Sequence, residues 1–169
     1  MAAAALFDDL IAANRRFAAG FAWRDVPREA ARGLAVVTCM DTRIDPASIF
    51  GFTVGDAKVL RNAGGRVTPD MLRSLTLATA MLGVRFVVVM HHTRCALAHC
   101  DERSLRALLP APQAAAVEWD LLGMPDPDAA LAADVGAVWS CASLAPGTEV
   151  EGWRYDVDTG LVHRVVRRG

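Results

Sequence analysis

The chain has 169 residues, 53% of them hydrophobic, and a formal net charge of -1 at pH 7. This length fits one domain, and the mean hydropathy of +0.26 fits a packed globule rather than a disordered chain. A charge so near zero gives no general attraction to nucleic acid or a membrane surface, so we expect neither as a partner. No apolar run reaches the roughly 20 residues that a transmembrane helix needs.

The first twenty residues predict a helical arm. Strong helix formers run up to Gly20, and their apolar side chains fall near one face of the expected helix. The segment lacks a basic start and runs into Asp8 and Asp9, which is unlike a secretory signal. Four cysteines without an export signal indicate a reducing compartment, so we expect a cytoplasmic protein.

Beyond residue 33 the pattern alternates strands with helices, which indicates an α/β fold. We expect a mainly parallel β-sheet flanked by helices, with the N-terminal helical arm and a C-terminal antiparallel hairpin, and residues 1–169 as a single domain. The predicted strands are 34–38, 57–61, 85–90, 148–157 and 161–166. The predicted helices are 68–82, 101–109, 112–122 and 126–140, the first of them capped by Thr68.

Two short segments that follow strands carry the most informative side chains. Cys39 ends the first predicted strand, and His92 and Cys95 follow the third. Because ligands of such folds bind beyond the carboxyl ends of parallel strands, we expect the three to meet at one edge of the sheet. Two thiolates and one imidazole suit zinc, and three protein ligands leave a fourth tetrahedral position open, as in a catalytic site.

Asp41 and Arg43 lie beside the first of these ligands. Arg43 can pair with Asp41 through its fork of donors, which lowers the pKa of the carboxyl group and fixes its rotamer. An ionised Asp41 can then orient a hydroxide in the open position, or it can move onto the metal and close the site if Arg43 releases it.

The wider context resembles the β-class carbonic anhydrases, above all their short prokaryotic members. The similarity runs from about residue 34 to the C-terminus and is weakest between 97 and 147. It is carried by CMDTRIDP at 39–46, GDAKVLRNAGG at 55–65, LRSL at 72–75, the His91-His92 pair and YDVDTG at 155–160.

This resemblance implies a lyase that hydrates carbon dioxide reversibly to bicarbonate and a proton through zinc-bound hydroxide. It implies one Zn²⁺ per subunit held by Cys39, His92 and Cys95, with Asp41 and Arg43 as the catalytic pair. It also implies a homodimer or tetramer with active sites near the subunit interface, which suits an apolar N-terminal arm.

Three further residues are candidates for contact with substrate, namely Asn62, Gly64 and Ala96, although Asn62 and Gly64 also suit a purely structural turn. The family usually has Gly at the position of Ala96, and short members often have Asp at the position of Arg94. Both departures bear on rate, anion affinity and substrate range.

Several alternatives stay open at this level. The same scaffold supports hydrolysis of carbonyl sulfide or carbon disulfide, and a zinc-binding homologue without catalysis is a third class. His91 is either a proton shuttle or a packing residue, and His99 is more typical of the surface. Cys100 and Cys141 lie outside any motif and are expected to fill the core.

Overall fold

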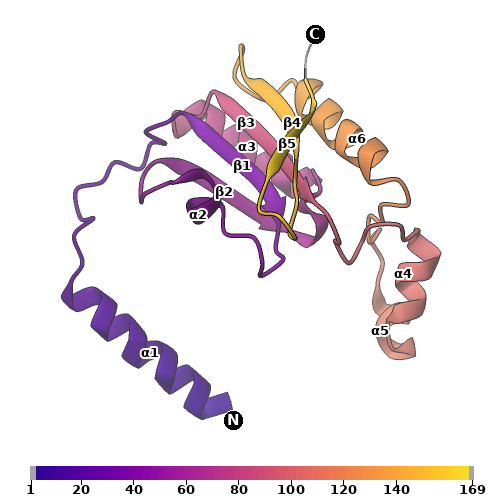
Figure 1. Cartoon of the computed structure of the whole chain (residues 1–169), viewed down its shortest axis with the longest axis horizontal. Coiled ribbons are helices and arrows are strands. Elements are labelled where there is room, and N and C mark those ends of the chain that lie inside the picture. Colours follow the sequence, from indigo (N-terminus) through magenta and orange to yellow (C-terminus); the bar gives the residue numbers. More distant parts are fainter. Residues whose placement is uncertain (1–2, 168–169) are drawn as a thin grey trace.

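The computed structural model describes residues 3–167, in which five strands form one sheet (Figure 1). The strand order is β2-β1-β3-β4-β5, and every neighbouring pair is parallel except β4 and β5. The predicted α/β fold with a mainly parallel sheet and a C-terminal antiparallel pair is confirmed. The strands are β1 (Leu34–Cys39), β2 (Ala57–Asn62), β3 (Phe86–His92), β4 (Glu149–Tyr155) and β5 (Val162–Val166).

Two helices, α3 (Pro69–Met81) and α6 (Pro127–Trp139), cover one face of the sheet (Figure 1). Each begins at a proline behind a capping residue, since the side chains of Thr68 and Asp126 accept hydrogen bonds from the first turn. The predicted cap at Thr68 is therefore confirmed. The core on this face combines buried strand and helix side chains, among them Val37, Val89, Leu75, Leu131 and Val135.

The opposite face carries a second apolar cluster and a short helix that we did not predict, α2 (Pro46–Phe50). Asp45 caps α2 by accepting from Ala47 N, and Gly51 ends it in the left-handed region. The sequence signal for α2 was therefore the Asp-Pro start and the glycine stop. The side chains on this face include Val36, Val88, Met90, Phe50 and Trp153.

The peripheral helices are α4 (Glu102–Leu108) and α5 (Ala111–Ala116). The second of them is shorter than predicted. The predicted helix 112–122 is wrong beyond residue 116. Side chains of α4 hold the following backbone outside a helix: Arg106 donates to the carbonyls of Val117 and Trp119, and Glu102 accepts from Leu121 N. Backbone groups satisfied in this way have no need of helical partners.

The third strand is longer than predicted, because β3 includes both His91 and His92. We expected these histidines just past the strand. Their backbones instead pair with Arg154 and Tyr155 of β4, which extends the parallel ladder to the edge of the sheet. His92 is consequently held by regular strand geometry rather than by a loop.

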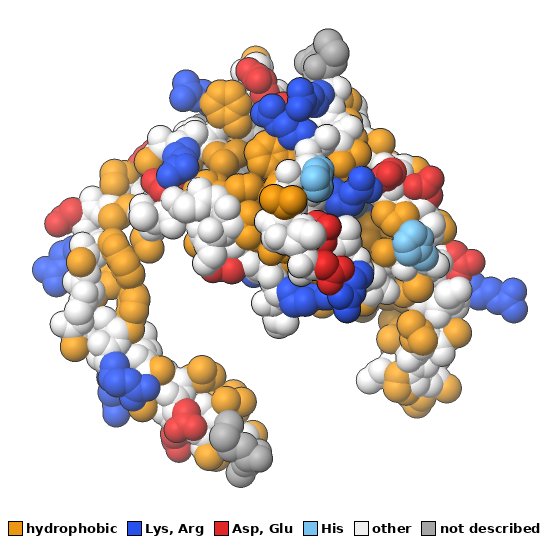
Figure 2. Space-filling view, viewed as in Figure 1, with side chains coloured by type: hydrophobic (Ala, Val, Ile, Leu, Met, Phe, Trp, Pro, Cys, Tyr) orange, Lys and Arg blue, Asp and Glu red, His pale blue; other side chains and the backbone are white. Residues whose placement is uncertain are grey.

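The N-terminal helix, α1 (Ala3–Ala19), stands away from the sheet and buries none of its side chains (Figure 1). Its exposed apolar residues line one side, which appears as orange along the arm in Figure 2. They are Leu6, Phe7, Leu10, Ile11 and Phe17. No helix within residues 3–167 is both long enough and apolar enough to span a bilayer.

Candidate metal centre

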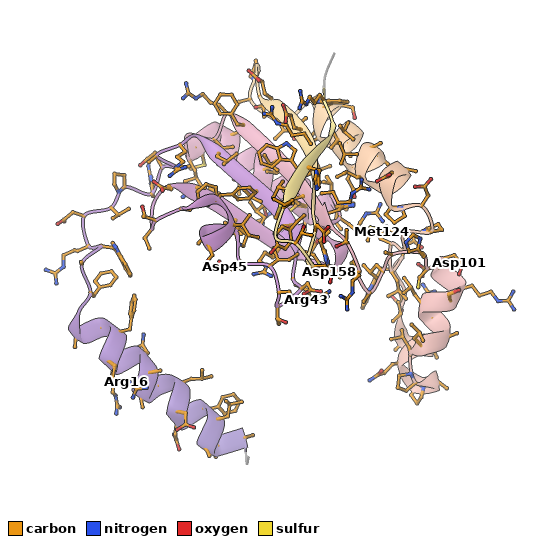
Figure 3. The ribbon with its side chains drawn as sticks, in the orientation of Figure 1. Arg16, Arg43, Asp45, Asp101, Met124 and Asp158 are labelled. Carbon is orange, nitrogen blue, oxygen red and sulfur yellow. The ribbon has the colours of Figure 1, made fainter. Side chains whose placement is uncertain are left out.

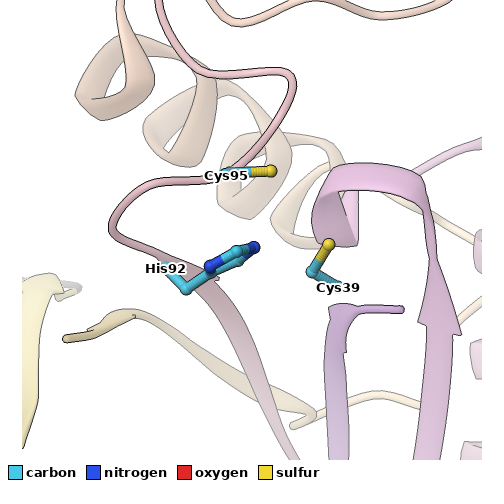
Figure 4. Close-up of side chains that lie close together, drawn as sticks. All are labelled: Cys39, His92 and Cys95. Carbon is cyan, nitrogen blue, oxygen red and sulfur yellow. The ribbon is translucent and has the colours of Figure 1, made fainter. Parts of the chain in front are cut away.

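Three buried side chains converge at the carboxyl edge of the sheet (Figure 4). The ligand atoms that Cys39, His92 and Cys95 offer lie within 4.8 Å of one another. Such spacing lets one metal ion contact all three. The structure thus brings the three predicted ligands together.

Strand register explains why two segments 50 residues apart meet. The last residue of β1, Cys39, pairs with Asn62 of β2, while its neighbour Thr38 pairs with Met90 of β3. Thr38 also donates through its hydroxyl to the carbonyl of Met90 at 2.9 Å, which fixes the two strand ends relative to each other. The chain turns directly after His92 and returns Cys95 toward the same point.

His92 is oriented for metal binding through one ring nitrogen. Its Nδ1 lies 2.9 Å from the carbonyl oxygen of Thr93, and its Nε2 is buried without a hydrogen-bond partner among the described residues. A metal-ligating histidine normally donates through its other nitrogen to an oxygen in this way. The buried, unpartnered Nε2 therefore fits a metal ligand.

The two thiols influence each other. The facing thiol of Cys95 lowers the pKa of Cys39 to about 4, and the backbone N–H groups of Asp41 and Gly64 act in the same direction. The pKa of Cys95 is raised because Cys39 lies beside it. Cys39 is therefore poised as a thiolate, and thiolate with imidazole is a donor set that selects zinc over hard cations. The residues present fit a zinc ion.

Asp41 is held beside this cluster by Arg43. Arg43 Nε donates to Asp41 Oδ1 at 2.9 Å and Nη2 donates to Oδ2 at 2.7 Å, while the Arg43 backbone N–H adds a third bond. These bonds keep the pKa of Asp41 well below its ordinary value. Asp41 Oδ2 lies 4.0 Å from His92 Nε2, so an ionised carboxylate stands next to the ligand atoms.

Backbone contacts lock this segment further. Arg61 of β2 donates to the carbonyls of Cys39 and Asp41 at 3.0 and 2.7 Å. Arg43 in turn donates to the carbonyl of Arg94, which joins the two halves of the centre. Arg61 was not predicted as a site residue, although its place near the end of β2, beside β1, was the available signal.

A pocket of about 400 Å³ opens onto the centre. Its lining includes two of the three residues predicted to contact substrate. Gly64 and Ala96 line this pocket together with Leu97, Asp41 and Arg43. Asn62 does not line it; its amide nitrogen donates to the carbonyl of Arg66 at 2.8 Å. Asn62 thus acts inside the turn that follows β2.

The other residues considered from the sequence lie in different environments. Arg94 adopts a left-handed backbone and pairs with Asp158 of the β4–β5 turn. Asp158 lies close to Arg43 (Figure 3). His91 is buried on the far side of β3 from His92, and His99 is exposed. Cys100 and Cys141, expected in the core, are only half-buried.

Comparisons with known proteins agree with this geometry. Residues 34–109 match the family model described as carbonic anhydrase. A β-carbonic anhydrase 1 of Mycobacterium tuberculosis is 29% identical over 158 residues, which span 94% of this chain and 96% of that protein. A carbon disulfide hydrolase of Acidianus is also 29% identical, over 76% of this chain and 74% of that protein.

A solved structure supports the match over nearly the whole chain. The carbonic anhydrase of Streptococcus mutans superposes with a TM-score of 0.83 and 35% sequence identity, covering 94% of this chain and 96% of that one. The chain belongs to the β-carbonic anhydrase family.

Proposed function

We propose that this protein is a zinc-dependent carbonic anhydrase that interconverts carbon dioxide and bicarbonate. Cys39, His92 and Cys95 hold the metal, one Zn²⁺ per subunit, and Asp41 with Arg43 forms the catalytic pair. The single observation that carries the proposal is the bidentate Asp41–Arg43 pair beside three converging ligands. A structural zinc site has no use for such a pair, so a non-catalytic homologue is disfavoured.

The residues around the centre have separate roles in the proposed reaction. A zinc ion held by Cys39, His92 and Cys95 would act as a Lewis acid and make water a nucleophile near neutral pH. Asp41 remains ionised because Arg43 holds it, so it can accept a hydrogen bond from that water and orient its lone pair. Leu97 and Ala96 line the pocket with apolar surface, which accepts an uncharged linear substrate.

Stopped-flow hydration of carbon dioxide, combined with metal analysis, tests the proposal. Purified protein is expected to contain one zinc per chain and to hydrate carbon dioxide between pH 6.5 and 9. Stoichiometric zinc without hydration at any pH in that range would reject the carbonic anhydrase assignment.

A second candidate is hydrolysis of carbonyl sulfide or carbon disulfide at the same centre. The observation favouring it is the similarity to the carbon disulfide hydrolase of Acidianus over three-quarters of this chain. Release of hydrogen sulfide from each sulfur substrate, measured beside carbon dioxide hydration on one preparation, separates the two. Faster turnover of a sulfur substrate would make the hydrolase the main activity.

We further propose that residues 1–169 form a single domain that assembles as a homodimer or tetramer, with α1 packed on a second copy. An isolated helix of this length is marginal in water, and its stripe of exposed apolar side chains calls for a partner surface. The half-covered sheet face around Phe86 and Trp153 offers apolar area of that kind.

The proposed setting is the cytoplasm. Support comes from the four cysteines, all free in this structure, since two of them must stay reduced to bind metal. Fractionation of cells that express the tagged chain tests this, and recovery outside the cytoplasmic fraction would overturn it.

A further inference from the structure

A buried ion cluster behind the metal centre has no part in the mechanism so far. It joins Arg66, which follows the turn after β2, to Asp134 of α6 and His91 of β3. The Arg66 and Asp134 side chains are 12% and 6% exposed, and that of His91 is 4% exposed. Charged groups this deeply buried are stable only with defined partners.

The carboxylate of Asp134 contacts donors from two parts of the chain. Oδ2 accepts from Arg66 Nε at 2.6 Å, and Oδ1 accepts from Val67 N at 3.0 Å. Oδ2 also lies 3.1 Å from His91 Nε2, within ion-pair distance. Burial alone would raise the pKa of Asp134, but the neighbouring donors hold the pKa below its ordinary value. The group is therefore an ionised anchor on α6.

One branch of the cluster leads to the Cys39 side of the metal centre. Arg66 and Val67 follow Gly64 and Gly65 directly, and both glycines have positive φ. A Cβ on Gly65 would come within 2.9 Å of the Cys39 backbone nitrogen, so this turn packs directly against the ligand's backbone. Holding Arg66 and Val67 on α6 thus fixes the turn against Cys39.

The other branch leads to the His92 side. His91 precedes His92 on β3 and points to the opposite face, where Asp134 lies. Neither ring nitrogen meets hydrogen-bond geometry with a partner within residues 3–167, and the 3.1 Å approach of Nε2 to Asp134 Oδ2 is the polar contact of this ring. One carboxylate therefore touches the neighbours of two ligands that come from different strands.

We propose that Asp134 is a positioning residue for the metal centre. Through Arg66 and Val67 N it sets the turn at 64–65 against Cys39, and through His91 it sets the end of β3 that carries His92. This role rests on the proposed zinc centre and adds to it a residue that lies outside the pocket. Its loss widens the spacing of the ligands rather than removing one of them.

The test is zinc affinity, measured on the full chain by competition with a chromophoric chelator. Asp134→Asn is expected to raise the dissociation constant of zinc about 10- to 100-fold, the usual effect of losing a residue that supports metal ligands. In the cobalt-substituted protein, the thiolate-to-metal absorption bands are expected to shift. A residue that served stability alone would lower the melting temperature and leave these bands unchanged.

A matched control is available on the same helix. Asp128 of α6 also pairs with an arginine, Arg154 of β4, but its side chain is 61% exposed and its ion pair reaches neither Arg66 nor His91, although it borders the hollow beside His92. Asp128→Asn is expected to keep zinc affinity and cobalt absorption at wild-type values. If Asp134→Asn does not fold, the double variant Arg66→Met/Asp134→Leu decides on the same criterion, because it leaves no unpaired buried charge.

The outcomes separate cleanly. Weaker zinc binding and shifted absorption in the folded Asp134 variant, with an unchanged Asp128 variant, support the positioning role. Wild-type zinc affinity and unchanged absorption in the folded variant overturn it while leaving the zinc centre intact. Failure of the wild-type protein to bind zinc overturns both this role and the proposed function.

Discussion

At the scale of single residues, Asp41 and Arg43 decide what the centre can do. Two parallel N–H···O bonds hold the carboxylate in one rotamer and keep it charged. Without Arg43, the same carboxylate, whose Oδ2 lies 4.0 Å from His92 Nε2, would be free to move toward the ligand atoms. The guanidinium therefore both activates Asp41 and restrains it.

Arg43→Lys tests the forked geometry while keeping the charge. An ammonium group cannot donate two parallel bonds, so kcat/KM for carbon dioxide hydration is expected to fall about 10- to 100-fold with zinc content unchanged. Arg94→Lys is the matched control, because the Arg94 side chain is exposed and points to Asp158 instead. Equal losses in the two variants would show that the fork does not matter.

The convergence of Cys39, His92 and Cys95 and the pairing of Asp41 with Arg43 were predictable, because both segments lie at the end of a strand whose apolar pattern is clear. Arg61 was not, because its role is to donate to two backbone carbonyls of the neighbouring strand. Such contacts depend on strand register, which single residues do not encode. Asn62 illustrates the same limit, since its amide serves the turn rather than the pocket.

At the scale of elements, the turn after β2 is the tightest part of the site. Gly65 has φ +69, and a Cβ there would meet the backbone of Thr38 and Cys39 at 2.9 Å. Neither backbone group can rotate away, because both belong to β1. The turn accordingly has no room for a side chain.

Gly65→Ala introduces both backbone strain and this steric clash. Gly160→Ala introduces backbone strain alone, so comparing the two variants isolates the cost of the clash. Gly160 has φ +73 with nothing within 4 Å of its Cβ position, so it is expected to lose only about 1–2 kcal/mol of unfolding free energy. Gly65→Ala is expected to lose about 1–3 kcal/mol more. Urea unfolding of the zinc-free proteins measures both, and equal losses would contradict the close packing.

Stability should depend on pH through Asp134. Its pKa is lower in the folded chain than the ordinary 3.8, so its stabilising contribution is complete above about pH 4 and disappears as pH falls through the folded value. Asp134→Asn is expected to lower the unfolding free energy by about 3 kcal/mol at pH 7. That difference should shrink below pH 4, and a difference independent of pH would contradict an ionised Asp134.

The periodicity of apolar residues predicted the long helices and strands. It failed where side chains, rather than backbone groups, form the hydrogen bonds of the backbone. The helix expected at 112–122 stops at residue 116 because Arg106 and Glu102 bind the backbone beyond it. The short α2 escaped notice because one turn leaves no periodic signal, although its cap and proline start were present.

At the scale of the whole molecule, the N-terminal arm has an apolar face that no other part of the same chain buries within residues 3–167. Helix α1 buries nothing, and its apolar side faces open space in Figure 2. The position of α1 relative to the sheet could not be predicted from the sequence. Amphipathic patterning shows that one face of a helix packs against another surface, but it does not identify that surface.

Charges placed on that face should break the assembly. The double variant Leu10→Asp/Ile11→Asp is expected to move the light-scattering mass from a multiple of 18.1 kDa toward the single-chain value. Ala12→Asp puts one charge of the same sign on the opposite side of α1 and should leave the mass unchanged. A monomeric wild-type protein would contradict the proposed assembly.

Catalysis by the zinc site is proposed to depend on the carboxylate of Asp41, and stopped-flow hydration of carbon dioxide by Asp41→Asn measures that dependence. With one zinc per chain retained, kcat/KM is expected to fall at least about 100-fold. Asp158→Asn, which removes a carboxylate near Arg43 but outside the pocket, should stay close to wild type. Full activity of Asp41→Asn at full zinc occupancy would show that hydration does not depend on the Asp41 carboxylate.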